Sequence, residues 1–263
     1  MLTTRLDALL WDVDGVLAET ERDGHRVAFN QAFEACGLPW RWDDARYGEL
    51  LRISGGRERL LADMATQPDA PALSQDREAL ARALHARKNT FHAQRIAAGA
   101  IPLRDGVLEL MQECLARGVR MGIASTTSRA NVDALLRHHL GAAWQGLFAA
   151  IVCGEDVQLK KPDPEVYVKA LRQLGDGPLQ VVAIEDSPGG VAAARAAAVP
   201  VLVTRSAYFG DAAIAGAIAI GPGLHDRRGW RPALARDGRS PVRIGLDDIE
   251  AWVDRWEAVP RFA

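Results

Sequence analysis

Short runs of apolar residues recur along this chain, and helical patterns separate most of them. The runs lie at 7–14, 118–125, 147–154, 180–187 and 199–205, with a weaker one at 216–221. Within each run the apolar residues are consecutive rather than alternating with polar ones, which is typical of strands covered by helices on both faces. The pattern therefore predicts a doubly wound α/β domain built on a parallel sheet.

The helical segments between these runs carry recognisable ends. The segment "RDGVLELMQECLARG" finishes on Gly118, a residue type suited to the position just after a helix. The segment "SPGGVAAARAAA" begins with Ser187 as a candidate N-cap and Pro188 at the first helical position. Residues 223–241 carry no such pattern, and we expect them to form an irregular loop.

The segment after the first apolar run breaks the alternation, because its patterns are all helical. They are "HRVAFNQAFEACG", "DARYGELLRI", "GRERLLADMA" and "REALARALHARKNTFHAQRI". Strand patterns resume only after this segment, so we expect a helical insertion into the α/β domain. We predict an α/β core of residues 1–17 and 103–263 and a small all-helical cap of residues 18–102. A cap joined by two short crossings is suited to hinged closure over a site.

Composition narrows the classes of partner. The 263 residues include 48% hydrophobic residues and carry a formal net charge of −2, which offers no field to attract nucleic acid or an anionic membrane. Cys36, Cys114 and Cys153 are far apart and show no metal-ligand spacing, as expected of a reducing compartment. With neither a signal-peptide pattern nor a membrane-spanning one, we expect a cytoplasmic monomer, or a plastid-like location in a phototrophic eukaryote.

Acidic residues follow two of the predicted strands at the point where each ends. Asp12 and Asp14 come after the first apolar run, and Glu185 and Asp186 close the run at 180–187. The carboxyl ends of parallel strands meet at one edge of the sheet, where ligands bind. Buried carboxylates need a partner or a metal, and Mg²⁺ prefers oxygen ligands. These residues predict a Mg²⁺ site, although the first pair, which precedes a glycine, could instead form only a turn.

A hydroxyl pair and a lysine complete the candidate site. Ser125 and Thr126 follow the second run, where their hydroxyls and backbone N–H groups could bind a phosphate oxygen or simply cap a helix. Lys161 lies in "KKPDP", whose two prolines could hold it inward, although a loop lysine is usually solvated. Taken together with the acidic pairs, these residues predict a site for Mg²⁺ and a phosphate group.

The motifs "DVDGV", the Ser125 strand end, "KKPDP" and "EDS" resemble the four ordered motifs of the haloacid dehalogenase superfamily of phosphotransferases, over essentially the whole chain. The resemblance implies that Asp12 is the nucleophile, a carboxylate already ionised at neutral pH. It implies that Asp14 is the general acid and base, a feature of the phosphatases and mutases that the dehalogenases lack. Lys161 and Ser125 would bind the transferring phosphoryl group, and Lys161 would offset the repulsion between Asp12 and phosphate.

The same resemblance implies a ligand set for the cofactor Mg²⁺. Asp12, the backbone carbonyl of Asp14 and Asp186 would bind the ion, with Glu185 as a direct or water-mediated ligand.

The predicted cap resembles that of the β-phosphoglucomutase and phosphoglycolate phosphatase branch, and more narrowly that of the CbbY group. The resemblance is carried by "ETERDGHRVAFNQAF", "PWRWDDARYGELLRISGGRERL" and "ARKNTF". It implies a small phosphosugar as substrate and hydrolysis of xylulose-1,5-bisphosphate to xylulose 5-phosphate. Activity as a β-phosphoglucomutase or a phosphoglycolate phosphatase is an alternative, and so is a non-catalytic regulatory module, because a fold alone does not give a function.

A bisphosphate needs a second anion site, for which the predicted cap offers candidates. Gly55 and Gly56 would let backbone N–H groups approach an anion, and Arg57 follows them directly. Lys88, beside an asparagine, is a second cation. Arg59 could also bind the distal phosphate or could be an ordinary solvated side chain.

Two further residues are candidates for binding sugar hydroxyls. Glu21 and His25 follow the first motif and face each other if the helix is regular, although His25 could be an ordinary surface histidine. One residue appears inserted before His25 relative to β-phosphoglucomutases, which puts mutase activity in doubt. We expect Trp40, Trp42 and Tyr47 to pack within the cap. Structural roles are expected for the other histidines, which are His85, His92, His138, His139 and His225.

Overall fold

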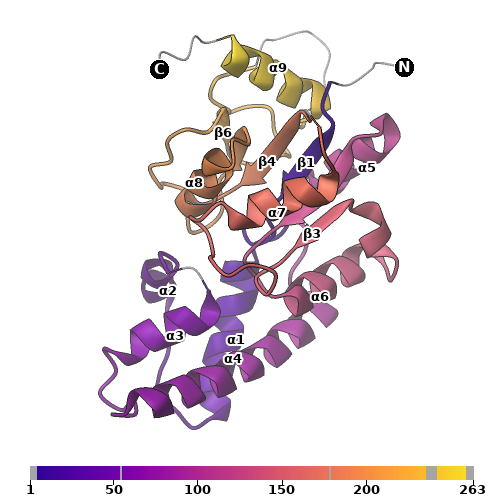
Figure 1. Ribbon diagram of the computed structural model, residues 1–263. Coiled ribbons are helices and arrows are strands. Elements are labelled where there is room, and N and C mark those ends of the chain that lie inside the picture. The colour runs from indigo at the N-terminus through magenta and orange to yellow at the C-terminus, as the bar shows by residue number, and fades with distance from the viewer. Residues whose placement is uncertain (1–4, 54, 178, 235–241, 259–263) are drawn as a thin grey trace.

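The structure is a computed structural model that describes residues 5–53, 55–177, 179–234 and 242–258. In Figure 1 a sheet with its covering helices forms the upper part, and further helices form the lower part. The strands pair in parallel in the order β3-β2-β1-β4-β5-β6. They are β1 (Ala8–Trp11), β2 (Arg120–Ala124), β3 (Ala150–Val152), β4 (Val181–Glu185), β5 (Val201–Thr204) and β6 (Ala219–Gly221). The predicted doubly wound α/β fold is confirmed.

The helices lie where the sequence patterns predict them. They are η1 (Thr20–His25), α1 (Arg26–Ala35), α2 (Asp44–Leu50), α3 (Gly56–Met64), α4 (Ser74–Ala97), α5 (Val107–Arg117), α6 (Arg129–Leu140), η2 (Trp144–Leu147), α7 (Glu165–Leu174), α8 (Pro188–Ala196) and α9 (Leu246–Glu257). Helix α5 ends at Gly118 in the left-handed conformation, and Ser187 caps α8 by accepting a hydrogen bond from the backbone N–H of Gly190. Both predicted helix ends are therefore correct.

Helices cover both faces of the sheet, which explains the uninterrupted apolar runs. On β1, Leu9 and Trp11 pack into a cluster with α5, α6 and α9. Ala8 and Leu10 point to the opposite face and pack with α7 and α8. Successive side chains of a strand alternate between faces, so a strand buried on both sides needs apolar residues at every position.

The elements from η1 to α4 (Thr20–Ala97), here called the helical block, form the lower part of Figure 1 and contain no strand among their described residues. The block has its own apolar cluster, in which Phe29, Phe33 and Trp42 pack against one another. Trp40 and Trp42 are buried there, as expected. The proposed boundaries of the cap at residues 18 and 102 stay a prediction.

The two chain segments that join the helical block to the sheet lie side by side. Ala18 forms an antiparallel bridge with Leu103. The guanidinium of Arg104 donates hydrogen bonds to the backbone carbonyls of Gly15 and Arg205. Both crossings are thereby fastened to each other and to the end of β5.

The segment after β6 covers the edge of the sheet. Arg231 exchanges two backbone hydrogen bonds with Ile220 of β6, and Trp230 stacks on Trp252 of α9. The described part of the predicted loop, residues 223–234, is irregular, and residues 235–241 lie outside the described residues. Within the described ranges, no helix combines the length and the apolar character that crossing a bilayer requires.

Candidate active site

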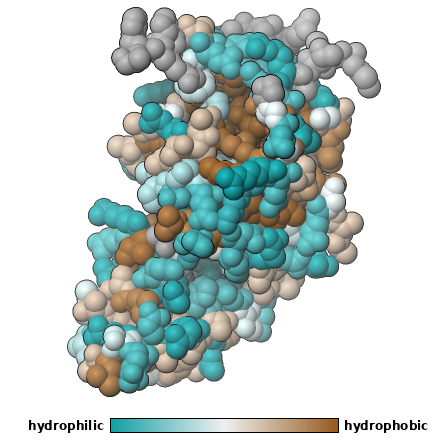
Figure 2. All heavy atoms as spheres, in the orientation of Figure 1, coloured by the Kyte–Doolittle hydropathy of each residue, from teal (hydrophilic) through white to brown (hydrophobic). Residues whose placement is uncertain are grey.

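The parallel register brings the carboxyl ends of the central strands level with one another. Trp11 pairs with Ile123 of β2 and with Ile184 of β4, and the next residue, Asp12, donates its backbone N–H to the carbonyl of Ile184. A cavity of about 570 Å³ lies where these strand ends meet the helical block. Most of the predicted site residues line it, namely Asp12, Asp14, Glu21, His25, Gly55, Gly56, Arg57, Lys88, Ser125, Thr126, Lys161 and Asp186. Hydrophilic residues predominate on the visible face of this junction (Figure 2).

Lys161 points into the site rather than into solvent. Its Nζ donates to Asp12 Oδ1 at 2.7 Å, to Glu185 Oε1 at 2.6 Å and to the backbone carbonyl of Ala124 at 2.8 Å. The lysine is buried, and these two carboxylates raise its pKa against the effect of burial. The alternative of a solvated loop lysine is therefore wrong, and Lys161 is the positive charge in direct contact with Asp12.

Asp12, Glu185 and Asp186 form an acidic cluster whose ligand atoms lie within 4.8 Å of one another. All three are buried. Burial, partly opposed by Lys161, raises the pKa of Asp12 to about 7. Burial and the neighbouring Asp12 and Glu185 raise the pKa of Asp186 well above its usual value. The single positive charge of Lys161 thus cannot balance the negative charges of three ionised carboxylates.

This donor set fits a hard divalent cation. Three buried carboxylates at the ends of two neighbouring strands, with like charges close together and little solvent, suit Mg²⁺, which prefers oxygen ligands. A cation among them would favour the ionised form of Asp12 and so lower its pKa. The arrangement is therefore compatible with the predicted ligands, and the particular ligand set stays a prediction.

Two glycines allow the chain to pass close to this cluster. Gly15 has a φ of 82°, and a side chain there would collide with the carboxylate of Asp186. A side chain at Gly190, in the first turn of α8, would collide with the carboxylate of Glu185.

Tyr167 of α7 donates its hydroxyl to Glu185 Oε1 at 2.6 Å. Sequence reasoning missed Tyr167, because its position marks it only as an apolar-face residue of a helix.

Ser125 and Thr126 lie beyond β2 at the same edge. Ser125 is buried, and its backbone N–H donates to the carbonyl of Val152. The residue that caps α6 is Ser128, whose side chain accepts from the backbone N–H of Asn131. The alternative in which Ser125 and Thr126 cap that helix is therefore wrong, and both residues line the cavity instead.

Asp14 is held by two residues of η1. Its Oδ1 accepts from the Thr20 hydroxyl at 2.5 Å and lies 3.2 Å from His25 Nε2. Burial lowers the pKa of His25 well below its usual value, so the ring is neutral at pH 7. A neutral imidazole that donates from Nε2 to a carboxylate fixes the orientation of Asp14. His25 is buried, so it is not an ordinary surface histidine.

The inserted residue before His25 has a structural counterpart. Residues Thr20–His25 form a π-helix rather than an α-helix. A π-helical turn accommodates one more residue than an α-helical turn, and such turns are frequent at functional sites. His25, at the end of this turn, contacts Asp14, whereas Glu21 binds Tyr47 and Arg59.

His92 of α4 stacks on His25, with ring centroids 4.0 Å apart. His92 is buried, and burial together with its neighbours His25 and Lys88 lowers its pKa far below the usual value. We expected only a structural role for His92, and its contact supports the ring that touches Asp14. The pairing joins two helices distant in sequence, so no local pattern indicates it.

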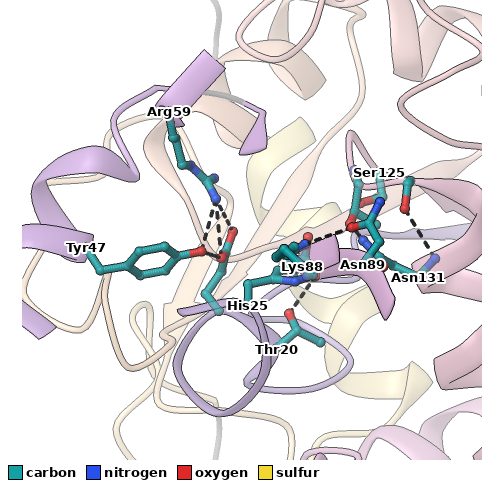
Figure 3. A network of polar contacts seen from close by, with 12 residues as sticks. Thr20, His25, Tyr47, Arg59, Lys88, Asn89, Ser125 and Asn131 are labelled. Carbon is teal, nitrogen blue, oxygen red and sulfur yellow. Dashed lines mark hydrogen bonds and ion pairs between the residues drawn. The ribbon is translucent and has the colours of Figure 1, made fainter. Parts of the chain in front are cut away.

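Glu21, Tyr47 and Arg59 form a polar group within the helical block. Tyr47 and Arg59 are labelled in Figure 3. Arg59 Nη1 lies 3.1 Å from Glu21 Oε1 and donates to the Tyr47 hydroxyl at 3.2 Å. The Tyr47 hydroxyl in turn donates to Glu21 Oε2. Arg59 is therefore not solvated, and its guanidinium already has a carboxylate partner. Tyr47 packs within the helical block as expected.

Two further cations of the helical block, Lys88 and Arg57, line the cavity. Lys88 is buried, lies 5.2 Å from the ring of Phe29, and donates to the Asn89 side-chain oxygen at 3.2 Å. Burial lowers the pKa of Lys88 to about 8. Arg57 is 47% exposed, and its nearest carboxylate contacts, with Glu58 and Glu78, are 3.9 Å long. Both side chains and the glycines before Arg57 line the same cavity, and the second anion site stays a prediction.

Comparisons with known proteins agree with this geometry. The family model for haloacid dehalogenase-like hydrolases matches residues 6–198. The chain is 42% identical over 221 residues to the protein CbbY, plasmid, of Cupriavidus necator, which covers 84% of this chain and 87% of that protein.

Two solved structures of CbbY from Rhodobacter sphaeroides are similar in fold to most of this chain. One contains phosphate, with a TM-score of 0.74, 39% identity, and coverage of 81% of this chain and 92% of that chain. The other is a substituted form in complex with xylulose-(1,5)bisphosphate, with a TM-score of 0.74, 38% identity and the same coverage.

Proposed function

The chain belongs to the haloacid dehalogenase-like hydrolase family, and we propose that it is a Mg²⁺-dependent phosphatase that hydrolyses xylulose-1,5-bisphosphate to xylulose 5-phosphate. The observation that carries the proposal is a single cavity lined from both sides. The strand ends and the loops that follow them contribute Asp12, Lys161 and the acidic cluster, and the helical block contributes Lys88 and Arg57. A relative at 38% identity binds the same bisphosphate.

At the sheet end, Asp12 is the proposed nucleophile. One of its carboxylate oxygens attacks phosphorus, and the bond between phosphorus and the sugar oxygen breaks, leaving an aspartyl phosphate. Lys161, 2.7 Å from Asp12 Oδ1, offsets the negative charge that gathers between the carboxylate and the phosphoryl group. Ser125 would donate its hydroxyl to a phosphoryl oxygen. Mg²⁺ bound by Asp12, Asp186 and their neighbours would supply further charge neutralisation and orient the phosphoryl group.

Asp14 is the proposed general acid and base. Its proton passes to the sugar oxygen as that oxygen leaves, and it then takes a proton from the water that attacks the aspartyl phosphate. The second step releases inorganic phosphate and restores Asp12. The contacts of Thr20 and His25 with Oδ1 keep the carboxyl group oriented for both transfers.

The second phosphate would bind to the cations of the helical block. Gly55 and Gly56 offer backbone N–H groups where α3 begins, and Arg57 and Lys88 supply charge. The sugar hydroxyls would lie between the two phosphates, next to Glu21 and His25. A monophosphate of the same size leaves these cations without an anion, so the proposal predicts a preference for bisphosphates.

A panel of phosphosugars assayed for phosphate release with Mg²⁺ tests the proposal. We expect kcat/KM for xylulose-1,5-bisphosphate to exceed that for phosphoglycolate by at least about tenfold, as one charged contact contributes roughly 1.5–3 kcal/mol. Equal, slow turnover of small monophosphates would contradict the substrate assignment. Isomerisation of β-glucose 1-phosphate, instead of its hydrolysis, would indicate a mutase.

The substitution Asp12→Asn separates an enzyme from a non-catalytic module. We expect it to lower phosphate release to background, while Asp254→Asn, in an exposed ion pair with Arg5, leaves the rate unchanged. Activity that survived Asp12→Asn would mean that Asp12 is not the nucleophile.

A further inference from the structure

An ion pair joins the sheet to the helical block beside the cavity. Lys160, the residue before Lys161 in the loop between β3 and α7, lies with its Nζ 3.0 Å from Oε1 of Glu58 on α3. Among the described residues this is the ion pair that connects α3 to the sheet. Both residues line the same cavity as Asp12.

The Glu58 carboxylate lies against the backbone of the glycine pair. Gly55 has a φ of 101°, and a side chain there would collide with the Glu58 carboxylate and with Lys160 Nζ. Oε2 of Glu58 is buried and has no hydrogen-bond partner among the described residues. A carboxylate therefore occupies the position beside Gly55 where an anion of the substrate would approach.

Positive charges outnumber negative ones around the Glu58 carboxylate. Glu58 is near two cations, Lys160 at 3.0 Å and Arg57 at 3.9 Å. Lys88, also on the cavity wall, donates to the neutral side-chain amide oxygen of Asn89. By contrast, Arg59 is already neutralised by Glu21. Arg57 also lies 3.9 Å from Glu78. Three cations, Lys160, Arg57 and Lys88, are thus set against the carboxylates of Glu58 and Glu78.

We propose that Lys160 is a specificity-determining residue that binds the second anionic group of the substrate, and that Glu58 occupies Lys160 until that group displaces it. The inference rests on the proposed function, since it requires a substrate with two anionic ends. A distal phosphate held by Lys160 from the sheet and by Arg57 from α3 connects the two parts of the molecule. A monophosphate leaves Glu58 on Lys160 and gains nothing from this contact.

The test is the ratio of kcat/KM for xylulose-1,5-bisphosphate to kcat/KM for phosphoglycolate. We expect Lys160→Gln to lower this ratio about 10- to 100-fold, the loss typical of one charge-assisted hydrogen bond. Lys160→Arg keeps the charge and should retain most of the ratio. Lys169→Gln, on α7 in an ion pair with Glu165, is the matched control and should leave activity and ratio unchanged.

The substitution Glu58→Gln distinguishes substrate binding from a structural role of the ion pair. Lys160→Gln and Glu58→Gln both remove the same ion pair, so a purely structural contact would give losses of the same sign. The proposal instead predicts opposite signs, because Glu58→Gln removes the competing carboxylate and should raise kcat/KM for the bisphosphate about 3- to 10-fold. Thermal unfolding of each variant checks that it folds.

A fall with both variants, or an unchanged ratio with Lys160→Gln, would overturn the inference. Failure of the proposed function gives a different result, since the wild-type protein itself would then show no preference for the bisphosphate.

Discussion

Replacing Arg59 by methionine should destabilise the protein before any substrate is added. Arg59 and Glu21 form an ion pair at 3.1 Å with side chains only 11% and 14% exposed. Removing one partner of a buried pair costs about 3–5 kcal/mol, because the other charge is left without compensation. Arg59 Nε also donates to the carbonyl of Ile53 at 2.9 Å, a bond of about 1 kcal/mol.

The pair opens onto the cavity, where water reaches Glu21, so we take the lower part of that range. We expect Arg59→Met to lower the free energy of unfolding by about 2–4 kcal/mol. For a chain of this size the midpoint of thermal unfolding should fall by roughly 5–15 °C. Arg82→Met, in an exposed pair with Glu78, is the matched control and should cost less than about 1 kcal/mol.

A double-mutant cycle assigns the loss to the pair. Urea unfolding of Arg59→Met, Glu21→Gln and the double variant should give a coupling energy of about 1–3 kcal/mol. Strictly additive losses would refute the ion-pair explanation. A variant with wild-type stability and poor substrate binding would instead support the view that Arg59 is a phosphate ligand.

Three further predictions follow from the site. Gly15→Ala should lower activity at least about tenfold, because the added Cβ would displace the carboxylate of Asp186. Gly118→Ala is the control: Gly118 has a comparable φ of 73° but open space around it, so this variant shows what backbone strain alone does to the rate. Mg²⁺ at about 100 times its Kd should stabilise the wild-type protein by about 2.7 kcal/mol in thermal unfolding, and Asp186→Asn should abolish most of that gain. Burial lowers the pKa of Lys88 to about 8, so its charge is present below that pH and kcat/KM for the bisphosphate should fall as pH rises above it. Lys88→Arg stays charged to far higher pH, and a pH profile that falls in the same way for this variant would mean that another group titrates.

The sheet could be predicted from the sequence because a strand buried on both faces appears as a run of consecutive apolar residues. All the apolar runs contain strands, and the register of the parallel strands then placed Asp12, Glu185 and Asp186 together. Residues at strand ends are predictable in this way, since the topology rather than any one side chain brings them to the same edge.

Contacts between distant helices could not be predicted in the same way. The stacking of His92 on His25 and the ion pair of Lys160 with Glu58 depend on how the helical block packs against the sheet. Arg59 looked like either a surface charge or a phosphate ligand, because its partner Glu21 lies on a different helix. The π-helix before His25 was hidden for another reason, namely that periodic patterns assume 3.6 residues per turn.

The bridge between Ala18 and Leu103 has a consequence for how this architecture can change over evolution. Because the two ends of the inserted segment are adjacent, the distance between the two points where it joins the α/β core stays short for any inserted segment. Closing such a gap with a longer or shorter segment changes the loop-closure free energy by only about 0.6 kcal/mol per doubling of length. The helical block can therefore be exchanged as a cassette, and a new substrate range can be acquired while the phosphate chemistry at the strand ends is inherited intact.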